Sequence, residues 1–120
     1  MIEHNVSLKP YNTFGLNAEA KLLVRVNSVA ALQEILADDK LMEEERFILG
    51  GGSNILLTRD VDGLIIKNEI SGIEVVHETD SHVLLRSGAG VVWHELVMHC
   101  IEKNHAGIEN LSLIPGNVGA

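Results

Sequence analysis

Apolar residues along this chain recur with the period of a strand in some segments and of a helix in others. The run from Lys21 to Val26 is rich in Leu and Val and predicts a buried strand. Ser28 has the character of a helix N-cap, and Asp38 and Asp39 with Lys40 are expected to mark the helix end. Between them, apolar residues recur at helical spacing, namely Val29, Leu32 and Leu36.

The remaining pattern predicts four more strands and a second helix. The strands are expected at residues 46–49, 64–67, 73–77 and 83–87. Asp80 and Ser81 supply a hairpin turn between the last two. An apolar stripe then predicts one amphipathic helix packed on the sheet; its members are Val92, Trp93, Leu96, Val97, Cys100 and Ile101. Together these elements predict a mixed sheet with two helices.

The composition is that of one globular domain. The chain has 120 residues, 46% of them hydrophobic and 22% charged, which is enough apolar material for a core. The formal net charge of −8 and the absence of a basic stripe argue against nucleic acid as a partner. A phosphorylated ligand would therefore have to be held by locally directed backbone N–H groups.

The candidate metal ligands and thiols of the chain are few. His94 and His99 are five residues apart, so they lie about 140° apart around a helix and cannot clasp one metal ion. Cys100 is the only cysteine, which excludes an internal disulfide and fits a reducing compartment. Because it lies on the apolar stripe, we expect a buried structural thiol rather than a nucleophile.

Neither end of the chain carries a recognisable targeting segment. Residues 1–10 lack the apolar region of a signal peptide, and no stretch approaches the roughly 18 apolar residues of a spanning helix. We therefore expect a cytoplasmic protein without a membrane span. The apolar, glycine-bearing tail at 111–120 is an unusual place for a domain to finish, and we expect the chain to be truncated there.

The strongest chemical signal is the run Gly50-Gly51-Gly52 directly after the strand at 46–49. Glycine lets the backbone turn sharply and approach a ligand without obstruction by a Cβ atom. The N–H groups of such a bend can converge on a pyrophosphate, and the Ser53 hydroxyl and Asn54 amide would add two hydrogen bonds. A tight turn without a ligand is an equally supported interpretation.

Two better-known phosphate motifs do not fit this loop. No Lys-Ser or Lys-Thr follows it, as a P-loop requires. A dinucleotide fingerprint would need a glycine where Ile55 stands and a helix after it, whereas the chain runs into a turn at 60–63.

A second glycine-bearing loop spans residues 114–120 and could expose further N–H groups. Paired with residues 50–54, it predicts two backbone loops that hold one extended diphosphate from opposite sides. FAD would fill such a geometry. The alternative is a turn at which the chain leaves the domain.

Four segments, in a fixed order, carry a resemblance to a known family. They are Asn12-Thr13-Phe14-Gly15, Leu49-Gly50-Gly51-Gly52-Ser53-Asn54, Gly88-Ala89-Gly90 and Glu109-Asn110-Leu111-Ser112-Leu113-Ile114-Pro115-Gly116. From Ser7 to Ala120 the chain resembles the UDP-N-acetylenolpyruvoylglucosamine reductase family. The resemblance implies an α+β fold of the p-cresol methylhydroxylase type, of which this chain would be the truncated first subdomain, a small mixed sheet with two helices.

The resemblance also implies a function and its site residues. It implies an NADPH-dependent FAD oxidoreductase that reduces the enolpyruvyl group of a UDP-sugar to UDP-N-acetylmuramate for peptidoglycan synthesis. Residues 1–17 would be an N-terminal segment and 18–120 the incomplete FAD-binding domain, without the substrate domain. The residues carried over as cofactor-binding are Leu49, Gly50, Gly51, Gly52, Ser53, Asn54 and Ile55, with Ile114, Pro115, Gly116 and Gly119 facing them.

The family's catalytic serine, glutamate and arginine would lie beyond Ala120, so we assign no catalytic residue and expect this chain alone to be inactive. A second hypothesis is a stand-alone nucleotide-binding or interaction module that uses the same glycine loop without redox chemistry. Another flavin oxidase of the same fold is disfavoured by the segment from Asn12 to Gly15.

Overall fold

Four strands form one mixed sheet, in the order β1-β2-β4-β3. The computed structural model describes every residue from Met1 to Ala120. β1 is antiparallel to β2, whereas β4 runs parallel to both β2 and β3. The bounds are β1 Ile2–Ser7, β2 Glu19–Val26, β3 Arg46–Leu49 and β4 Val61–Asn68. The predicted strands at 21–26, 46–49 and 64–67 are thus confirmed.

Two helices follow β2. α1 (Val29–Leu36) begins as predicted, because the Ser28 Oγ accepts a hydrogen bond from the Ala31 N–H at 3.1 Å. The stretch expected to end this helix instead starts another one, α2 (Asp39–Met42). The Asp38 carboxylate accepts from the N–H of Lys40 at 3.0 Å and of Leu41 at 3.3 Å, and so caps the new helix. The Asp38 side chain therefore caps the start of α2 at the place where the end of α1 was expected.

The central strands β2 and β4 are covered on both faces, which explains the consecutive apolar residues at 22–24 of β2 and at 64–66 of β4. One face packs against α1 and α2, and the other against the N-terminal turn and the loop after β3. Neighbouring residues of one strand point to opposite faces, as Leu22 and Leu23 do opposite Leu64 and Ile65. The buried side chains are Leu22, Val24, Val26, Leu41, Leu64 and Ile66 on one face and Leu8, Ala20, Leu23, Leu49 and Ile65 on the other.

Strand β1 gave no signal in the polar start of the chain. Its side chains are exposed or half-buried, so it lacks an apolar pattern. It is held by backbone pairing with β2, in which Ile2 lies opposite Val24 and Val6 opposite Ala20. Edge pairing of this kind depends on a partner strand and cannot be read from local residues alone.

The second half of the chain forms a separate two-stranded sheet, not a continuation of the first. β5 (Ile73–Glu78) and β6 (Val83–Ser87) pair antiparallel, and the predicted turn at 80–81 is confirmed by the Thr79 N–H, which donates to the His82 carbonyl at 2.8 Å. α3 (Trp93–Glu102) packs on this hairpin and not on the larger sheet, so that part of the prediction is wrong. The chain turns away from β4 through Gly72, at a φ of +106°, which separates the two sheets.

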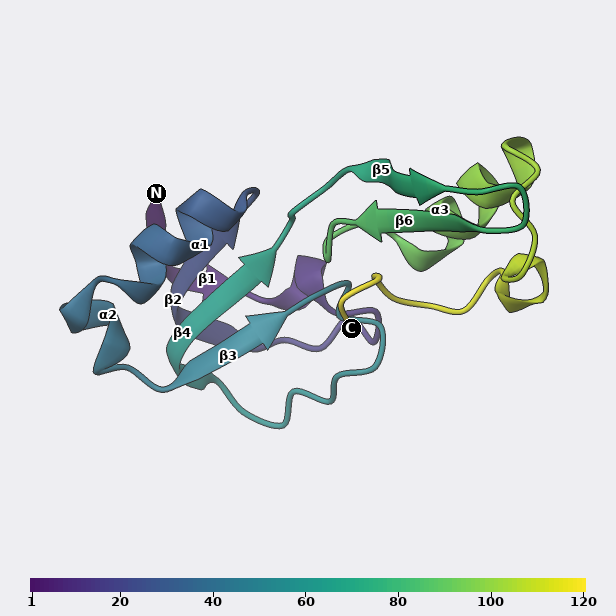
Figure 1. The fold of residues 1–120 in the computed structure, drawn as a ribbon. Coiled ribbons are helices and arrows are strands. Elements are labelled where there is room, and N and C mark those ends of the chain that lie inside the picture. The colour runs from purple at the N-terminus through teal and green to yellow at the C-terminus, as the bar shows by residue number, and fades with distance from the viewer.

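The molecule is elongated, with extents of 50 × 32 × 17 Å, and has two lobes. We call residues 1–68 the sheet lobe and residues 69–120 the hairpin lobe; the latter also contains the short helix η2 (Glu109–Leu111). The C-terminal segment runs from the hairpin lobe back to the end of β3 (Figure 1). The mixed sheet and separate hairpin confirm the α+β class.

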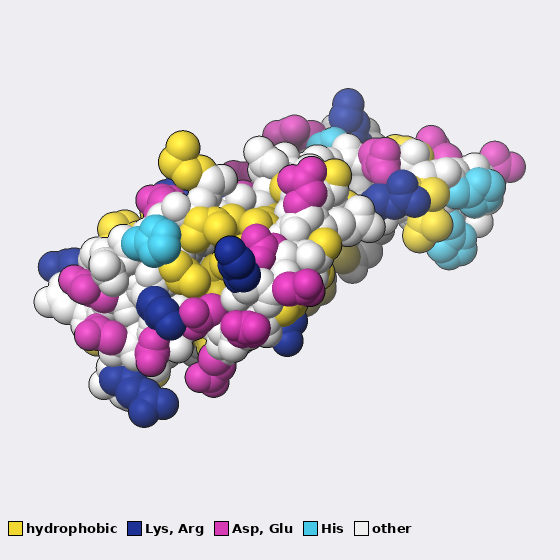
Figure 2. All heavy atoms as spheres, turned by 90° about the vertical axis from the view of Figure 1, so that its left-hand side faces the viewer, with side chains coloured by type: hydrophobic (Ala, Val, Ile, Leu, Met, Phe, Trp, Pro, Cys, Tyr) yellow, Lys and Arg dark blue, Asp and Glu magenta, His cyan; other side chains and the backbone are white.

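On the face shown in Figure 2, acidic and basic side chains are interleaved around apolar ones. None of the three α-helices has the length and apolar character that crossing a bilayer requires.

Candidate functional site

The three glycines lie at the carboxyl end of β3, beside the ends of the parallel strands β2 and β4. Ligands of sheets with parallel strands often bind at this edge. Leu49, the last residue of β3, points its side chain into the core and lies opposite Lys67 of β4. Leu49 could therefore contribute to a ligand only through its backbone.

The N-terminal turn at residues 11–13 packs closely against the glycine loop. Gly52 has a φ of +66°, and a Cβ atom there would lie 1.9 Å from the Tyr11 carbonyl oxygen. The Thr13 N–H donates to the Gly52 carbonyl at 3.0 Å. The buried Asn12 amide holds this turn, because its Nδ2 donates to the Leu8 carbonyl at 2.8 Å and its Oδ1 accepts from the Leu16 N–H at 2.8 Å. Two of the resembling segments thus form one unit.

The backbone N–H groups of residues 50–54 have no acceptor within the chain. Two carbonyls of this stretch are occupied, since the Gly50 oxygen accepts from the Lys67 ammonium and the Gly52 oxygen from the Thr13 N–H. In a trans peptide the C=O and the next N–H point in opposite directions. The N–H groups of Gly51 and Ser53 therefore point away from these internal partners and are free to bind an anion.

The second loop is anchored to the hairpin lobe. The Trp93 N–H donates to the Gly116 carbonyl at 2.9 Å, and the Gly119 N–H donates to the Ala89 carbonyl at 3.0 Å. Asn117 Nδ2 donates to the Gly90 carbonyl at 3.2 Å. The Gly88-Ala89-Gly90 segment thus positions the loop at 116–119, which brings the third and fourth resembling segments together.

The two loops touch each other. A Cβ atom on Gly51 would lie 2.9 Å from Asn117 Oδ1 and 3.6 Å from Gly116 Cα. A Cβ atom on Gly116 would lie 3.3 Å from Ser53 Oγ. The loops therefore lie side by side, and the N–H groups of Gly116 and Asn117, like those of residues 50–54, have no acceptor in the chain. Part of the reason for glycine at position 51 is this contact between loops.

The remaining predicted site residues take different positions. Ile55 packs its side chain against the sheet, and Asn54 is exposed beside the loop. Ile114 and Pro115 are exposed and lead into the second loop without making a side-chain hydrogen bond. The structure thus joins residues 50–54 with 116–119, whereas Ile114 and Pro115 lie at the margin.

Sequence reasoning missed Lys67. Its half-buried ammonium donates to the Gly50 carbonyl, and burial lowers its pKa below the usual 10.5. No carboxylate lies within ion-pair distance of it, whereas Arg25, its neighbour on β2, lies 3.7 Å from the Glu3 carboxylate. The signal was the parallel register between β3 and β4, which a single sequence does not reveal.

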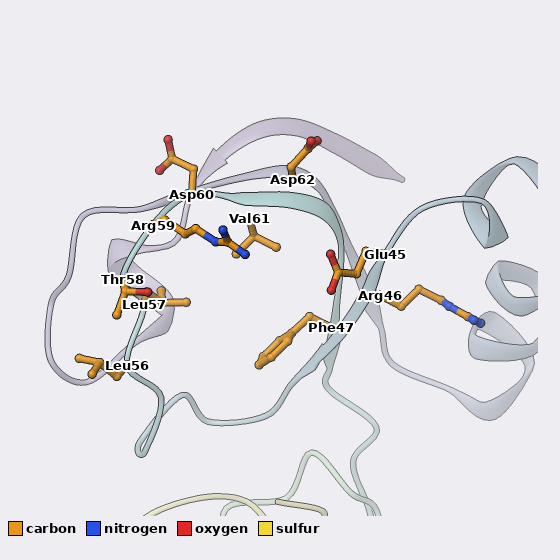
Figure 3. Close-up of a pocket in the computed structure, with 10 residues that line it drawn as sticks. All are labelled: Glu45, Arg46, Phe47, Leu56, Leu57, Thr58, Arg59, Asp60, Val61 and Asp62. Atoms are coloured by element: carbon orange, nitrogen blue, oxygen red, sulfur yellow. The ribbon is translucent and has the colours of Figure 1, made fainter.

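A separate hollow of about 270 Å³ lies at the free edge of β3. Figure 3 shows Phe47 and Arg59 directed into it and Arg46 directed away. Its lining mixes both arginines with Glu45 and two aspartates and does not include the glycine loop. Three carboxylates thus accompany two guanidinium groups, and nothing in this hollow indicates a particular ligand.

Cys100 and His94 occupy structural positions. Cys100 lies on the buried face of α3, and burial raises the pKa of its thiol, which keeps the thiol protonated. His94 Nδ1 accepts a hydrogen bond from the Leu113 N–H at 3.2 Å and so fastens the C-terminal segment to α3. No group of three or more His, Cys, Asp and Glu side chains is arranged to hold a metal ion.

Comparison with known proteins gives consistent matches. A family model described as "FAD binding domain" matches residues 20–120. The UDP-N-acetylenolpyruvoylglucosamine reductase of Flavobacterium johnsoniae is 51% identical over 118 residues, which are 98% of this chain and 34% of that protein. The reductase of the same name from Amoebophilus asiaticus is 49% identical over 119 residues, 99% of this chain and 35% of that protein.

A solved structure extends the likeness to the fold. The crystal structure of UDP-N-acetylenolpyruvylglucosamine reductase from Thermus caldophilus matches with a TM-score of 0.70 and 28% identity, covering 99% of this chain and 40% of that one. The resemblance and the fold class predicted from the sequence are thereby confirmed. The chain spans about a third of the length of the curated relatives it matches.

Proposed function

This chain belongs to the FAD binding domain family, and from that premise we propose that its two touching loops hold the diphosphate of FAD. The cofactor-binding residues would be Leu49 to Ile55 together with Ile114, Pro115, Gly116 and Gly119. Gly51, Gly52 and Ser53 would donate backbone N–H groups, and the Ser53 hydroxyl would add a further hydrogen bond. Leu49 and Ile55 would hold the loop to the core.

One observation carries this proposal. Five consecutive N–H groups, those of residues 50–54, have no acceptor in the chain, although the carbonyls of Gly50 and Gly52 are paired. Unpaired backbone donors are rare in folded proteins unless water or a ligand satisfies them. The net charge of −8 means that an anionic ligand gains nothing from the overall field, so such local donors must supply the attraction.

We extend the proposal to the whole protein's activity from the relatives named UDP-N-acetylenolpyruvoylglucosamine reductase. The protein would reduce the enolpyruvyl group of a UDP-sugar with electrons from NADPH, in the synthesis of peptidoglycan precursors. Bound FAD would accept the hydride and pass it on. The residues of this chain would bind and orient the cofactor, and none is assigned to hydride or proton transfer.

The domain boundaries and the location are part of the same proposal. We assign residues 18–120 to the FAD-binding domain, with support from a family match that starts at residue 20. Residues 2–7 pair with that domain's sheet, so the N-terminal segment would be attached to it. A single, reduced Cys100 fits a cytoplasmic location.

The visible absorption spectrum of the purified full-length protein tests the proposal. We expect the bands of bound oxidised flavin, and their loss on reduction by NADPH. A folded protein that shows no such bands and takes up no added FAD would contradict the proposal. Binding of ADP by such a protein would favour the alternative, a nucleotide-binding module without redox chemistry.

The Gly51→Val variant tests the site itself. A side chain at this position would meet Asn117 at 2.9 Å and stand among the unpaired N–H groups, so we expect loss of flavin with the strands retained. Thr58→Val is the matched control, because it places the same residue at an exposed position of the loop between β3 and β4. Unchanged flavin content in Gly51→Val would remove the diphosphate assignment.

A further inference from the structure

Lys67 is the only cation of the sheet lobe that is not exposed, and unlike Lys21 and Arg25 it has no carboxylate within ion-pair distance. Lys21 lies 2.9 Å from the Glu44 carboxylate and 3.6 Å from that of Asp62. Arg25 lies 3.7 Å from Glu3 and 3.8 Å from Glu69. The Lys67 ammonium is half-buried, and its one hydrogen-bond partner is the Gly50 carbonyl. Burial lowers the pKa of Lys67, and Glu69, which acts on it from beyond ion-pair distance, offsets this only in part. A partly desolvated charge without a paired carboxylate is costly unless an anion approaches it.

The hydrogen bond from Lys67 also fixes the orientation of one peptide. The acceptor is the carbonyl of the Gly50–Gly51 peptide, and the N–H of Gly51 is the other end of the same planar unit. With the carbonyl held toward Lys67 of β4, the Gly51 N–H points the opposite way, away from β4. Glycine has no side chain to restrict this peptide, so an external anchor is needed to select one orientation.

The strand register brings Lys67 to this point. Leu49, the residue before the glycines, lies opposite Lys67 in the parallel ladder between β3 and β4. The side chain of Lys67 can therefore reach the first carbonyl after β3 ends. The Gly52 carbonyl, two residues further on, is held in a similar way, because it accepts a hydrogen bond from the Thr13 N–H at 3.0 Å. One anchor is a neutral backbone donor and the other carries a charge.

We propose that Lys67 is a positioning residue of the diphosphate site, which holds the Gly50–Gly51 peptide with its N–H toward the ligand and adds a positive charge on the carbonyl side of that peptide. This inference rests on the proposed function of the two loops. It predicts that Lys67 matters for ligands that carry the diphosphate and not for the flavin ring alone. Lys67 takes no part in proton or hydride transfer.

The test compares two ligands that share the flavin ring, FAD and riboflavin, on the full-length protein freed of its cofactor. Flavin fluorescence gives the affinity of each for the wild type and for the Lys67→Met variant. We expect the FAD dissociation constant of Lys67→Met to rise on the order of tenfold or more, because a charge-assisted contact is lost. The riboflavin constant should change less than about twofold, since riboflavin has no phosphate.

Two further variants control for charge and for folding. Lys21→Met removes the same charge from β2, near Glu44 and Asp62 and away from the glycine loop, and should leave both affinities unchanged. Lys67→Arg keeps the charge and should recover part of the FAD affinity. If Lys67→Met does not fold, Lys67→Gln serves in its place, and the same preferential loss of FAD affinity is expected.

The outcomes separate this inference from the proposed function. A wild type that binds FAD while Lys67→Met binds it equally well overturns the role of Lys67 and leaves the loops as the site. Equal losses of FAD and riboflavin affinity also overturn it, because they show a general structural effect. A wild type that binds neither flavin overturns the proposed function itself.

Discussion

The sheet lobe completes its own core, whereas the hairpin lobe does not. Only four of the 19 buried residues lie in the hairpin lobe, namely Val91, Leu96, Val97 and Cys100. The hairpin lobe leaves large apolar side chains exposed on both strands and on the C-terminal segment, among them Leu84 at 58% and Leu113 at 76%. A sheet covered on two faces forms a closed core, and a two-stranded hairpin with one helix cannot.

This difference decides how each loop of the site is held. The glycine loop follows the buried Leu49 at the end of β3 and is supported by the turn at 11–13 and by Lys67. The loop at 116–119 is tied to the hairpin lobe by backbone and amide hydrogen bonds at Ala89, Gly90, Val91 and Trp93, and by Val118, which packs against the small apolar cluster of that lobe. We therefore expect the glycine loop to be the rigid half of the site and the second loop to be the more easily displaced half.

The largest expected effect separates the cores of the two lobes. Leu64 is fully buried in the apolar cluster between the main sheet and the helices α1 and α2. Leu64→Ala should therefore lower the free energy of unfolding by about 2–5 kcal/mol. Leu84→Ala, on the exposed side of the hairpin, should change it by less than about 0.5 kcal/mol. Urea denaturation measures both. A cost at Leu84 similar to that at Leu64 would show that the hairpin face is covered in solution, contrary to the comparison.

The next effect concerns the support of the glycine loop by the sheet lobe. Gly15 and Gly52 have nearly the same φ, +64° and +66°, but only Gly52 is enclosed. Gly15→Ala should cost about 1 kcal/mol for the backbone conformation alone. Gly52→Ala should cost roughly 1–3 kcal/mol more, because its Cβ would meet the Tyr11 carbonyl at 1.9 Å and displace the loop. Thermal unfolding checks the difference, and equal costs would refute the close approach.

The smallest effect belongs to the hairpin lobe and depends on pH. The N–H groups of Glu109 and of Gly107 donate to the Glu109 carboxylate and hold its pKa below the usual 4.5. Because the folded-state pKa is depressed, the stabilisation is present above about 4.5 and is lost as the pH falls through the folded-state value.

Glu109→Gln should remove this part of the acid sensitivity of stability. Glu102→Gln should leave it in place, because Glu102 is an exposed residue of α3 without such hydrogen bonds. Stability measured well below and well above pH 4.5 in the three proteins checks this. An unchanged acid response in Glu109→Gln would show that the turn at 107–109 does not depend on the carboxylate.

Local signals in the sequence predicted most of the elements correctly. The Ser28 cap, the strand at 46–49 and the hairpin turn at 80–81 each depend on neighbouring residues, and each was found where expected. The glycine loop was also identified locally, from missing side chains after a strand.

Features that depend on distant pairing could not be predicted. β1 is held by its partner strand, and Lys67 reaches Gly50 only because β3 and β4 are parallel in a particular register. The contact between Gly51 and Asn117 joins residues far apart in the chain. Sequence reasoning therefore placed the two loops around a common ligand but did not foresee that they touch.

The crystal structure of the full-length protein with FAD bound tests the central claim most directly. The account predicts diphosphate oxygens about 2.7–3.2 Å from the backbone nitrogens of Gly51, Gly52 or Ser53. A cofactor whose diphosphate lies elsewhere, with these N–H groups bonded only to water, would contradict it.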